Sequence, residues 1–147
     1  ISPDGGALFV ADYSNHKIRR VEVATGEVTT VAGSGTRGSA DGVGDAAEFD
    51  FPFGLAISPD GGALFVADHC NYKIRRVEVA TGEVTTVAGS GTEGSADGVG
   101  DAAELNGPVE VAISADGSTL FVGSNGGLRQ GMVTFLVGDD KERIEHV

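Results

Sequence analysis

The residues of this chain that could bind a metal or act as nucleophiles are three histidines and a single cysteine. They are His16, His69, His146 and Cys70. A zinc site needs several such ligands converging on one centre, but the histidines occupy non-equivalent positions of a repeated unit. Cys70 stands where the other copy has Ser14. We therefore expect no functional metal at the histidines, no other cofactor and no catalytic residue.

Acidic residues recur in two long glycine-rich stretches, of which the first covers residues 33–52. Their carboxylates are Asp41, Asp45 and Glu48, repeated as Asp97, Asp101 and Glu104. Carboxylate oxygens suit Ca²⁺, but the dense alternation of acids found in calcium-binding loops is missing. Two interpretations stay open, a calcium site and a solvated acidic loop, and we favour the second.

Two basic stripes, Lys17–Arg20 and Lys73–Arg76, both read Lys-Ile-Arg-Arg. They could form a binding surface, or their guanidiniums could be solvated and paired with acidic neighbours such as Glu78 and Glu83. We favour pairing because the formal net charge is −12. This charge, with few aromatic residues, argues against nucleic-acid binding. No apolar run approaches the ~18 residues of a membrane helix, so we expect no membrane insertion.

A 56-residue unit positions these side chains, and it occurs twice. Residues 1–56 and 57–112 are identical at 46 of 56 positions, and a third copy begins at Ile113 and degrades after Val122. Self-similarity at a fixed period is typical of repeat architectures, whose units bury their apolar faces against one another.

Each unit contains four strand signals separated by turns. In the second copy the strands are expected at 55–58, 63–68, 73–79 and 83–88, with Asp60-Gly61 as a hairpin turn. The second strand is apolar at every position, which indicates burial on both faces. In the third, a bulge near Arg75-Arg76 would place Ile74 and Val77 on one buried side. We expect Asn71 in a left-handed conformation and the fourth strand at a half-exposed edge.

The predicted fold is therefore all-β: a partial β-propeller of four-stranded antiparallel blades. A parallel β-helix is the alternative, but its coils are shorter and lack repeated hairpins. The chain resembles NHL-repeat proteins, whose pattern it matches at Pro52–Ile57, at Leu8–Asp12 and Leu64–Asp68, and at Asn15–Ile18 and Asn71–Ile74, except that Tyr72 replaces His. The resemblance covers about 1–137 and implies a six-bladed propeller in a complete protein.

The expected organisation is a partial first blade at 1–32, a second at 54–88 and a third at 108–137, followed by a polar tail at 138–147 that could be helical. We interpret the chain as a fragment of a longer protein. Because the first blade lacks its inner strand and this number of blades cannot close a ring, apolar faces should stay exposed. We expect the chain to cover them with the remaining blades of a parent protein or by self-association.

The ten differences between the two copies point to a binding face. They fall in the loop between strands two and three, in the connection between units, and in the first residues of the next unit's first strand. In an up-and-down blade these loops share one face, and loops on a rigid scaffold carry function. The candidate contact residues are Tyr13, Ser14, His16, Arg37, His69, Cys70, Tyr72 and Glu93.

The sequence therefore favours a scaffold module that binds a protein partner through this face. Unconstrained drift of the loops is the competing explanation of the differences. The alternative function is part of a propeller lyase or hydrolase whose catalytic residues lie in other blades, because propellers host both scaffolds and enzymes.

Overall fold

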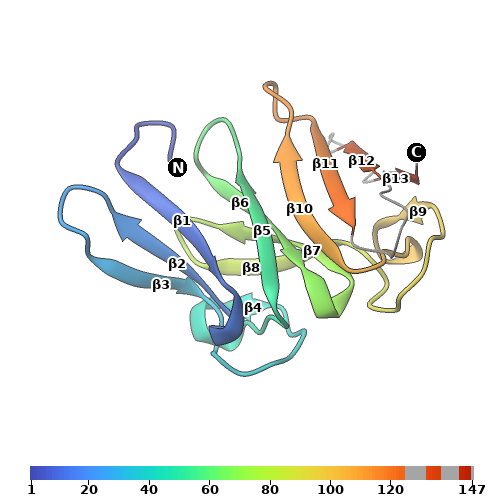
Figure 1. Ribbon diagram of the computed structural model, residues 1–147, viewed down its shortest axis with the longest axis horizontal. Helices are drawn as coiled ribbons and strands as arrows, with labels where there is room; N and C mark the ends of the chain where they lie inside the picture. The colour runs from blue at the N-terminus through green and yellow to red at the C-terminus, as the bar shows by residue number, and fades with distance from the viewer. Residues whose placement is uncertain (125–131, 137–142, 147) are drawn as a thin grey trace.

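The computed structural model describes residues 1–124, 132–136 and 143–146. It confirms the all-β expectation. Three antiparallel sheets lie side by side in chain order (Figure 1). We call the sheets blades 1, 2 and 3 in chain order. The near face of a blade is turned toward the preceding blade, and the far face toward the following one.

Blade 1 contains only the outer three of the expected strands, in the order β1-β2-β3. They are β1 (Ala7–Asp12), β2 (Lys17–Glu22) and β3 (Val28–Ala32). A turn at residues 2–6 precedes β1, and it is closed by the hydrogen bond from the Ala7 N–H to the Ser2 hydroxyl. The inner edge of β1 therefore has no partner strand within its sheet.

Blades 2 and 3 each contain five strands, one more than the sequence predicts. Blade 2 is formed by β5 (Pro52–Ile57), β6 (Ala63–Asp68), β7 (Lys73–Glu78), β8 (Glu83–Ala88) and β4 (Gly42–Val43). Blade 3 is formed by β10 (Pro108–Ile113), β11 (Thr119–Ser124), β12 (Met132–Leu136), β13 (Arg143–His146) and β9 (Gly98–Val99).

The additional strands come from the long connections between units. The connection after blade 1 runs to the outer rim of blade 2, where β4 pairs with β8, and then turns back to begin β5. The fourth strand of blade 2 is half-exposed, as expected, but it is not an edge along its whole length, because β4 pairs with its first two residues, Glu83 and Val84. Short 3₁₀ turns follow the extra strands at Gly44–Ala46 (η2) and Gly100–Ala102 (η4).

The same connections also supply core residues, which the expectation of a solvated acidic loop did not include, although Asp41 and Asp45 are exposed. Ala47 and Phe49 are fully buried between blades 1 and 2, and Ala103 and Leu105 are fully buried between blades 2 and 3. Each pair packs between the two neighbouring sheets. The sequence does not predict the burial of these residues, because they stand singly among glycines and acidic residues and not in an apolar run.

The two-sided burial predicted for the second strand is confirmed in blade 2. Leu64 and Val66 pack in the cluster shared with blade 1, while Phe65 and Ala67 pack in the cluster shared with blade 3. The expected bulge is present, but it lies on β8 opposite the step between Ile74 and Arg75. It does not bring Ile74 and Val77 to one side: they lie in the two different clusters, because both faces of this blade are covered.

The expectation for the C-terminal end is partly wrong. Residues 143–146, placed in a polar tail, form β13, which pairs with both β12 and β9. Of the rest of that tail, residues 138–142 and 147 lie outside the described residues, as do residues 125–131 and 137.

Candidate functional site

The loop between β1 and β2 in blade 1 and the loop between β6 and β7 in blade 2 each begin with a 3₁₀ turn. These turns are η1 (Tyr13–Asn15) and η3 (His69–Asn71). Asn71 does not adopt the expected left-handed conformation. Its side-chain amide instead donates to Asp68 Oδ2 at 2.8 Å and to the carbonyl of Gly38 at 2.7 Å. The left-handed residue is the next one, Tyr72 (φ 53°) or His16 (φ 54°) in the first copy. The 3₁₀ turn and the left-handed residue after it therefore set the direction of the His16 side chain in blade 1 and of the Tyr72 side chain in blade 2.

These turns meet the connections between units on one face of the molecule, as predicted. The Cys70 N–H donates to the carbonyl of Asp50 at 3.0 Å, and the Phe51 N–H donates to His16 Nδ1 at 3.2 Å. Three aromatic rings and two imidazoles gather at this meeting point. We call them, with one arginine, the loop-face patch: Tyr13, His16, Arg37, Phe51, Phe53 and His69.

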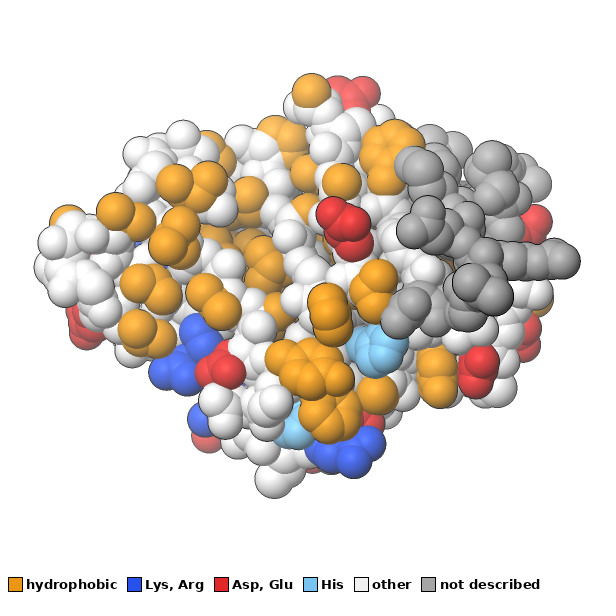
Figure 2. Space-filling model, viewed as in Figure 1, with side chains coloured by type: hydrophobic (Ala, Val, Ile, Leu, Met, Phe, Trp, Pro, Cys, Tyr) orange, Lys and Arg blue, Asp and Glu red, His pale blue; other side chains and the backbone are white. Residues whose placement is uncertain are grey.

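The rings of the loop-face patch contact one another in a continuous row. Tyr13 lies 4.7 Å from Phe51 and 5.5 Å from Phe53, the second pair edge to face at 85°. His16 lies 4.7 Å from Phe51, and His69 lies 6.1 Å from Phe53. Figure 2 shows two histidine side chains beside a group of hydrophobic side chains. Phe53 is 54% exposed and Tyr13 39% exposed, so the row is a surface feature and not a core.

Phe51 occupies a backbone conformation that disfavours a bulky residue. Its φ is 55°, in the left-handed region, where a side chain costs roughly 1–2 kcal/mol relative to glycine. The equivalent residue of the second copy is Gly107, whose φ is 54°. The two connections therefore follow the same path, but only the first places an aromatic ring at this strained position. Strain of this kind is common at functional sites.

Arg37 closes one side of the loop-face patch. Its guanidinium lies 4.9 Å above the ring of Phe51 and donates to both carboxylate oxygens of Asp50, at 2.8 and 3.3 Å. The Asp50 hydrogen bond raises the pKa of Arg37, and the Asp50 charge adds to the effect. Asp50 itself is anchored, because its N–H donates to Asp68 Oδ1 at 2.8 Å.

In the second basic stripe, Lys73–Arg76, both arginines are engaged in ion pairs within the chain. Arg75 is fully buried: it donates to Asp68 and Asp41 at 2.7 Å each and lies 5.4 Å from the ring of Phe49. The expected solvation is therefore wrong for Arg75, although the expected pairing with acids is present. Arg76 pairs with Glu78. Burial raises the pKa of Asp68, while Asn71, the Asp50 N–H and Arg75 act in the opposite direction.

Asp41, one of the carboxylates considered as a calcium ligand, is engaged by groups of the protein itself. One oxygen receives Arg75 and the Thr86 hydroxyl, and the other receives the Thr86 N–H. The carboxylate thus joins the connection to blade 2. Across the described part of the chain, no three His, Cys, Asp or Glu residues lie close enough together to hold a metal.

His16 and His69 each form a hydrogen bond between Nδ1 and a backbone group. His16 Nδ1 accepts from the Phe51 N–H, whereas His69 Nδ1 lies 3.2 Å from the carbonyl of Pro108 and must donate, because a carbonyl only accepts. The Cys70 thiol has a raised pKa, first because it is partly buried and then because Asp50 is near. A thiol held in its protonated form is a weak nucleophile.

The structure brings together only part of the residue set expected from the sequence. Tyr13, His16, Arg37 and His69 belong to the loop-face patch, and Cys70 borders it through Asp50. Ser14 is exposed beside the patch, and Glu93 belongs to the second blade boundary, where its backbone bridges to Leu105. Tyr72 caps η3 there.

Sequence reasoning missed Phe51, Phe53 and Asp50 as site residues. A signal for them exists: all three differ between the two copies, which have Gly107, Val109 and Asn106 at the equivalent positions. The second boundary therefore has the same backbone path without the aromatic row, and this makes the first boundary the candidate site.

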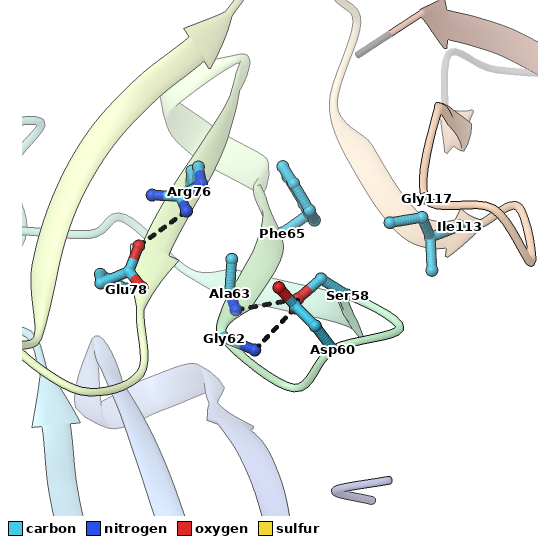
Figure 3. Close-up of a pocket in the computed structure, with 9 residues that line it drawn as sticks. All are labelled: Ser58, Asp60, Gly62, Ala63, Phe65, Arg76, Glu78, Ile113 and Gly117. Atoms are coloured by element: carbon cyan, nitrogen blue, oxygen red, sulfur yellow. Dashed lines mark hydrogen bonds and ion pairs between the residues drawn. The ribbon is translucent and has the colours of Figure 1, made fainter. Parts of the chain in front are cut away.

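A cavity of about 230 Å³ between blades 2 and 3 is a weaker candidate (Figure 3). Its two long charged side chains, Arg76 and Glu78, pair with each other at 2.6 Å. Asp60 accepts from the Ser58 hydroxyl and the Gly62 N–H within its own turn. The polar groups that line the cavity are thus already engaged with one another.

Comparison with known proteins places the chain among β-propellers. No family model matches. The chain is 34% identical over 94 residues to NHL repeat-containing protein 2 of Gallus gallus, covering 64% of this chain and 12% of the relative. It is 41% identical over 78 residues to Protein SUPPRESSOR OF QUENCHING 1, chloroplastic, of Arabidopsis thaliana, covering 53% of this chain and 7% of the relative. The chain therefore spans a small part of these relatives.

Solved structures agree on the fold. An auxiliary nutrient binding protein from Bacteroides thetaiotaomicron superposes with a TM-score of 0.75 at 24% identity, covering 99% of this chain and 36% of that one. A chain of the nidogen/laminin complex superposes with a TM-score of 0.68 at 15% identity, covering 96% and 44%. Among the described residues, no helix is long and apolar enough to cross a bilayer.

Proposed function

We propose that this chain, which consists of NHL-type repeats folded into a partial β-propeller, is a binding module that recognises a protein partner through the loop-face patch. Exposed apolar side chains rimmed by polar groups mark interaction surfaces. Tyr, Phe and Arg are enriched at such surfaces. The aromatic rings bury much area and lose little side-chain entropy, and the planar guanidinium of Arg offers several hydrogen-bond donors. The patch combines these residue types on a rigid turn.

One observation carries the proposal: the aromatic row is present at one blade boundary and missing at the other, although the backbone is the same. If the rings served only to join blades, the second boundary would need them too. It has Gly107 and Val109 instead of Phe51 and Phe53. Phe51 moreover occupies a left-handed position that glycine would occupy without strain. A ligand-binding role accounts for both facts.

The second boundary provides a matched control for an experiment. A patch-swapped variant carries the residues of the second copy in the first: Tyr13→His, His16→Tyr, Arg37→Glu, Asp50→Asn, Phe51→Gly and Phe53→Val. Because these residues already occur on the same backbone path, the variant should fold. A random peptide library displayed on phage is depleted on this variant and then selected on the wild-type chain.

We expect peptides that bind the wild type and lose at least about tenfold in affinity, or ~1.4 kcal/mol, on the variant. They should be rich in apolar side chains that can lie against Tyr13 and Phe53. A reciprocal variant keeps His69 and introduces the other five residues at the second boundary, as Tyr72→His, Glu93→Arg, Asn106→Asp, Gly107→Phe and Val109→Phe. It should raise the binding stoichiometry from one to two. Selected peptides that bind wild type and swapped variant equally would contradict the proposal.

A further inference from the structure

His16 is a buried imidazole that holds the backbone of Phe51 through a ring nitrogen without a proton. Its side chain belongs to the buried polar residues, and its Nδ1 accepts from the Phe51 N–H at 3.2 Å. A ring nitrogen accepts a hydrogen bond only in the neutral imidazole, whose proton then lies on Nε2. A second proton at Nδ1 turns this acceptor into a donor, so that two N–H groups point at each other.

Phe51, which loses its acceptor in that event, is already strained. Its φ of 55° lies in the left-handed region, which a bulky residue keeps only where the surrounding structure holds it there. A buried backbone N–H without an acceptor is itself unfavourable. Protonation of His16 therefore removes one of the restraints on Phe51 and leaves the strain in place.

The ring of Phe51 also joins the loop-face patch at its centre. It lies 4.7 Å from Tyr13 and 4.7 Å from His16, and the guanidinium of Arg37 lies 4.9 Å above it. A backbone change that takes Phe51 out of the left-handed region would carry its ring away from all three. Of the contacts of Tyr13 within the row, only the one with Phe53 would remain.

The charged groups around His16 offer an added proton no compensation. They are Asp12 and Lys17 from its own loop, Arg37 and Asp50 from the connection, and Asp68 from the loop of blade 2. Each of the three carboxylates already accepts from an arginine of the chain, and the lysine and arginine carry the same charge as an imidazolium. The other titratable groups of these loops are Tyr13, Cys70 and His69.

His69 is a matched histidine whose backbone contact does not depend on protonation. Its Nδ1 donates to the carbonyl of Pro108 at 3.2 Å, so a second proton, on Nε2, leaves this hydrogen bond intact. The second boundary also has Tyr72 in place of His16 and Gly107 in place of Phe51. Neither the acceptor nor the strained ring is therefore repeated there.

We propose that His16 is a pH switch of the loop-face patch: the neutral ring holds the aromatic row together, and the protonated ring releases Phe51 and weakens partner binding. The effect on binding rests on the function proposed above. Histidine is the side chain that ordinarily changes charge between about pH 5 and pH 8. Because the neutral form makes the hydrogen bond, binding is strong at neutral pH and weaker in mildly acidic solution.

Proton NMR of the whole chain tests the switch without a ligand. Nuclear Overhauser contacts between the rings of Tyr13 and Phe51 should be present at about pH 7.5 and lost at about pH 5, once the ring protons of His16 have titrated. In the matched variant His16→Asn, the amide oxygen replaces Nδ1 as acceptor, and Asn tolerates the left-handed conformation and does not titrate. This variant should keep the contacts at both pH values. His69→Asn keeps a side-chain donor and should behave like the wild type.

Peptides selected on the wild-type chain at about pH 7.5 measure the effect on binding. Only selected peptides without His, Asp or Glu are used, so that the chain alone titrates. Their affinity should fall at least about tenfold at about pH 5 for the wild type and for His69→Asn, since the contact that positions Phe51 is lost. For His16→Asn the affinity should change less than about twofold.

The two measurements separate the switch from the proposed function. Ring contacts that persist after His16 has titrated would overturn the switch, because the imidazolium would then hold Phe51 in place; so would an equal loss in His16→Asn. Rings that separate while the peptides bind equally at both pH values would overturn the regulation and leave the proposed function intact. Peptides that do not distinguish the patch-swapped variant contradict the proposed function, and the ring contacts still decide the switch.

Discussion

Blades 1 and 2 have nearly the same sequence but different neighbours, so comparing them separates local effects from tertiary ones. Residues 17–32 are identical to 73–88, and residues 7–12 are identical to 63–68. β1 and β2 begin and end at the same repeat positions as β6 and β7 and share their register, and the bulge on β3 opposite β2 recurs on β8 opposite β7. Only the start of the last of these strands differs, at Val28 in β3 and Glu83 in β8. Yet Leu64 is fully buried while Leu8 is 42% exposed. Local structure follows the sequence here, whereas burial follows the neighbours.

The paired arginines show the largest consequence of this difference. Arg75 is enclosed by the connection and contacts two carboxylates and two carbonyls, while Arg19 pairs with Asp12 at the surface, each 28% exposed. The same arginine in the same local sequence is thus buried in blade 2 and forms a partly exposed ion pair in blade 1, depending on the neighbouring segments. The predictions below use such matched pairs.

Arg75→Ala should cause the largest loss, about 3–5 kcal/mol of unfolding free energy, because it leaves the carboxylate of Asp68 buried without its cation. Arg19→Ala should cost less than about 1 kcal/mol, as expected for an exposed ion pair. Urea denaturation of both variants measures the contrast. Similar losses for both would mean that burial by the connection adds nothing to the pair.

Leu64→Ala should cost about 2–5 kcal/mol, since it opens a cavity in a filled interface. The same substitution at Leu8 should cost under about 1 kcal/mol when the chain is dilute enough to be monomeric, because that side chain is already partly in water. Denaturation at two protein concentrations separates the cases. A loss at Leu8 that grows with protein concentration would indicate that association covers it.

Phe51→Gly should change the unfolding free energy by less than about 1 kcal/mol. Loss of the ring's contacts with Tyr13 and His16 is offset by release from the left-handed strain. Gly107→Ala, the matched change at the second boundary, should lose about 1 kcal/mol because it introduces that strain. Thermal melts of both variants test this. A loss above about 3 kcal/mol for Phe51→Gly would make the ring a structural residue.

The smallest effect concerns the turns before the second strands, which do not depend on neighbouring blades. The Ser2 and Ser58 hydroxyls and the backbone N–H groups lower the pKa of Asp4 and Asp60 alike. In blade 3 the hydroxyl of Ser114, the Ser118 N–H and the Ser118 hydroxyl lower the pKa of Asp116 to about 2.

Because these folded-state pKa values lie below the unfolded value, the ionised carboxylates stabilise the fold above about pH 4, and this contribution is lost as the pH falls through the folded pKa. Asp116→Asn should therefore lower stability slightly at pH 6, and the difference should vanish near pH 2. A difference that is constant with pH would mean that ionisation of Asp116 does not contribute.

The sequence by itself determined the elements and their faces. The hairpin turns, β6 and β8 with their bounds, the burial of β6 on both sides and the meeting of loops on one face are all local or periodic properties. They depend on turn chemistry, on alternation and on the 56-residue period. Identical segments fold identically in two blades for this reason.

Tertiary structure decided what each side chain meets. The outer strand β4, the burial of Phe49, the enclosure of Arg75 by Asp41 and the separation of Ile74 from Val77 all depend on one connection passing between two sheets. Contacts of this kind join residues about 30 positions apart and leave no periodic trace. The aromatic row had a trace in the differing positions 51 and 53, but only the fold places these rings beside Tyr13, because exposure and proximity belong to the assembled blades and not to the single repeat.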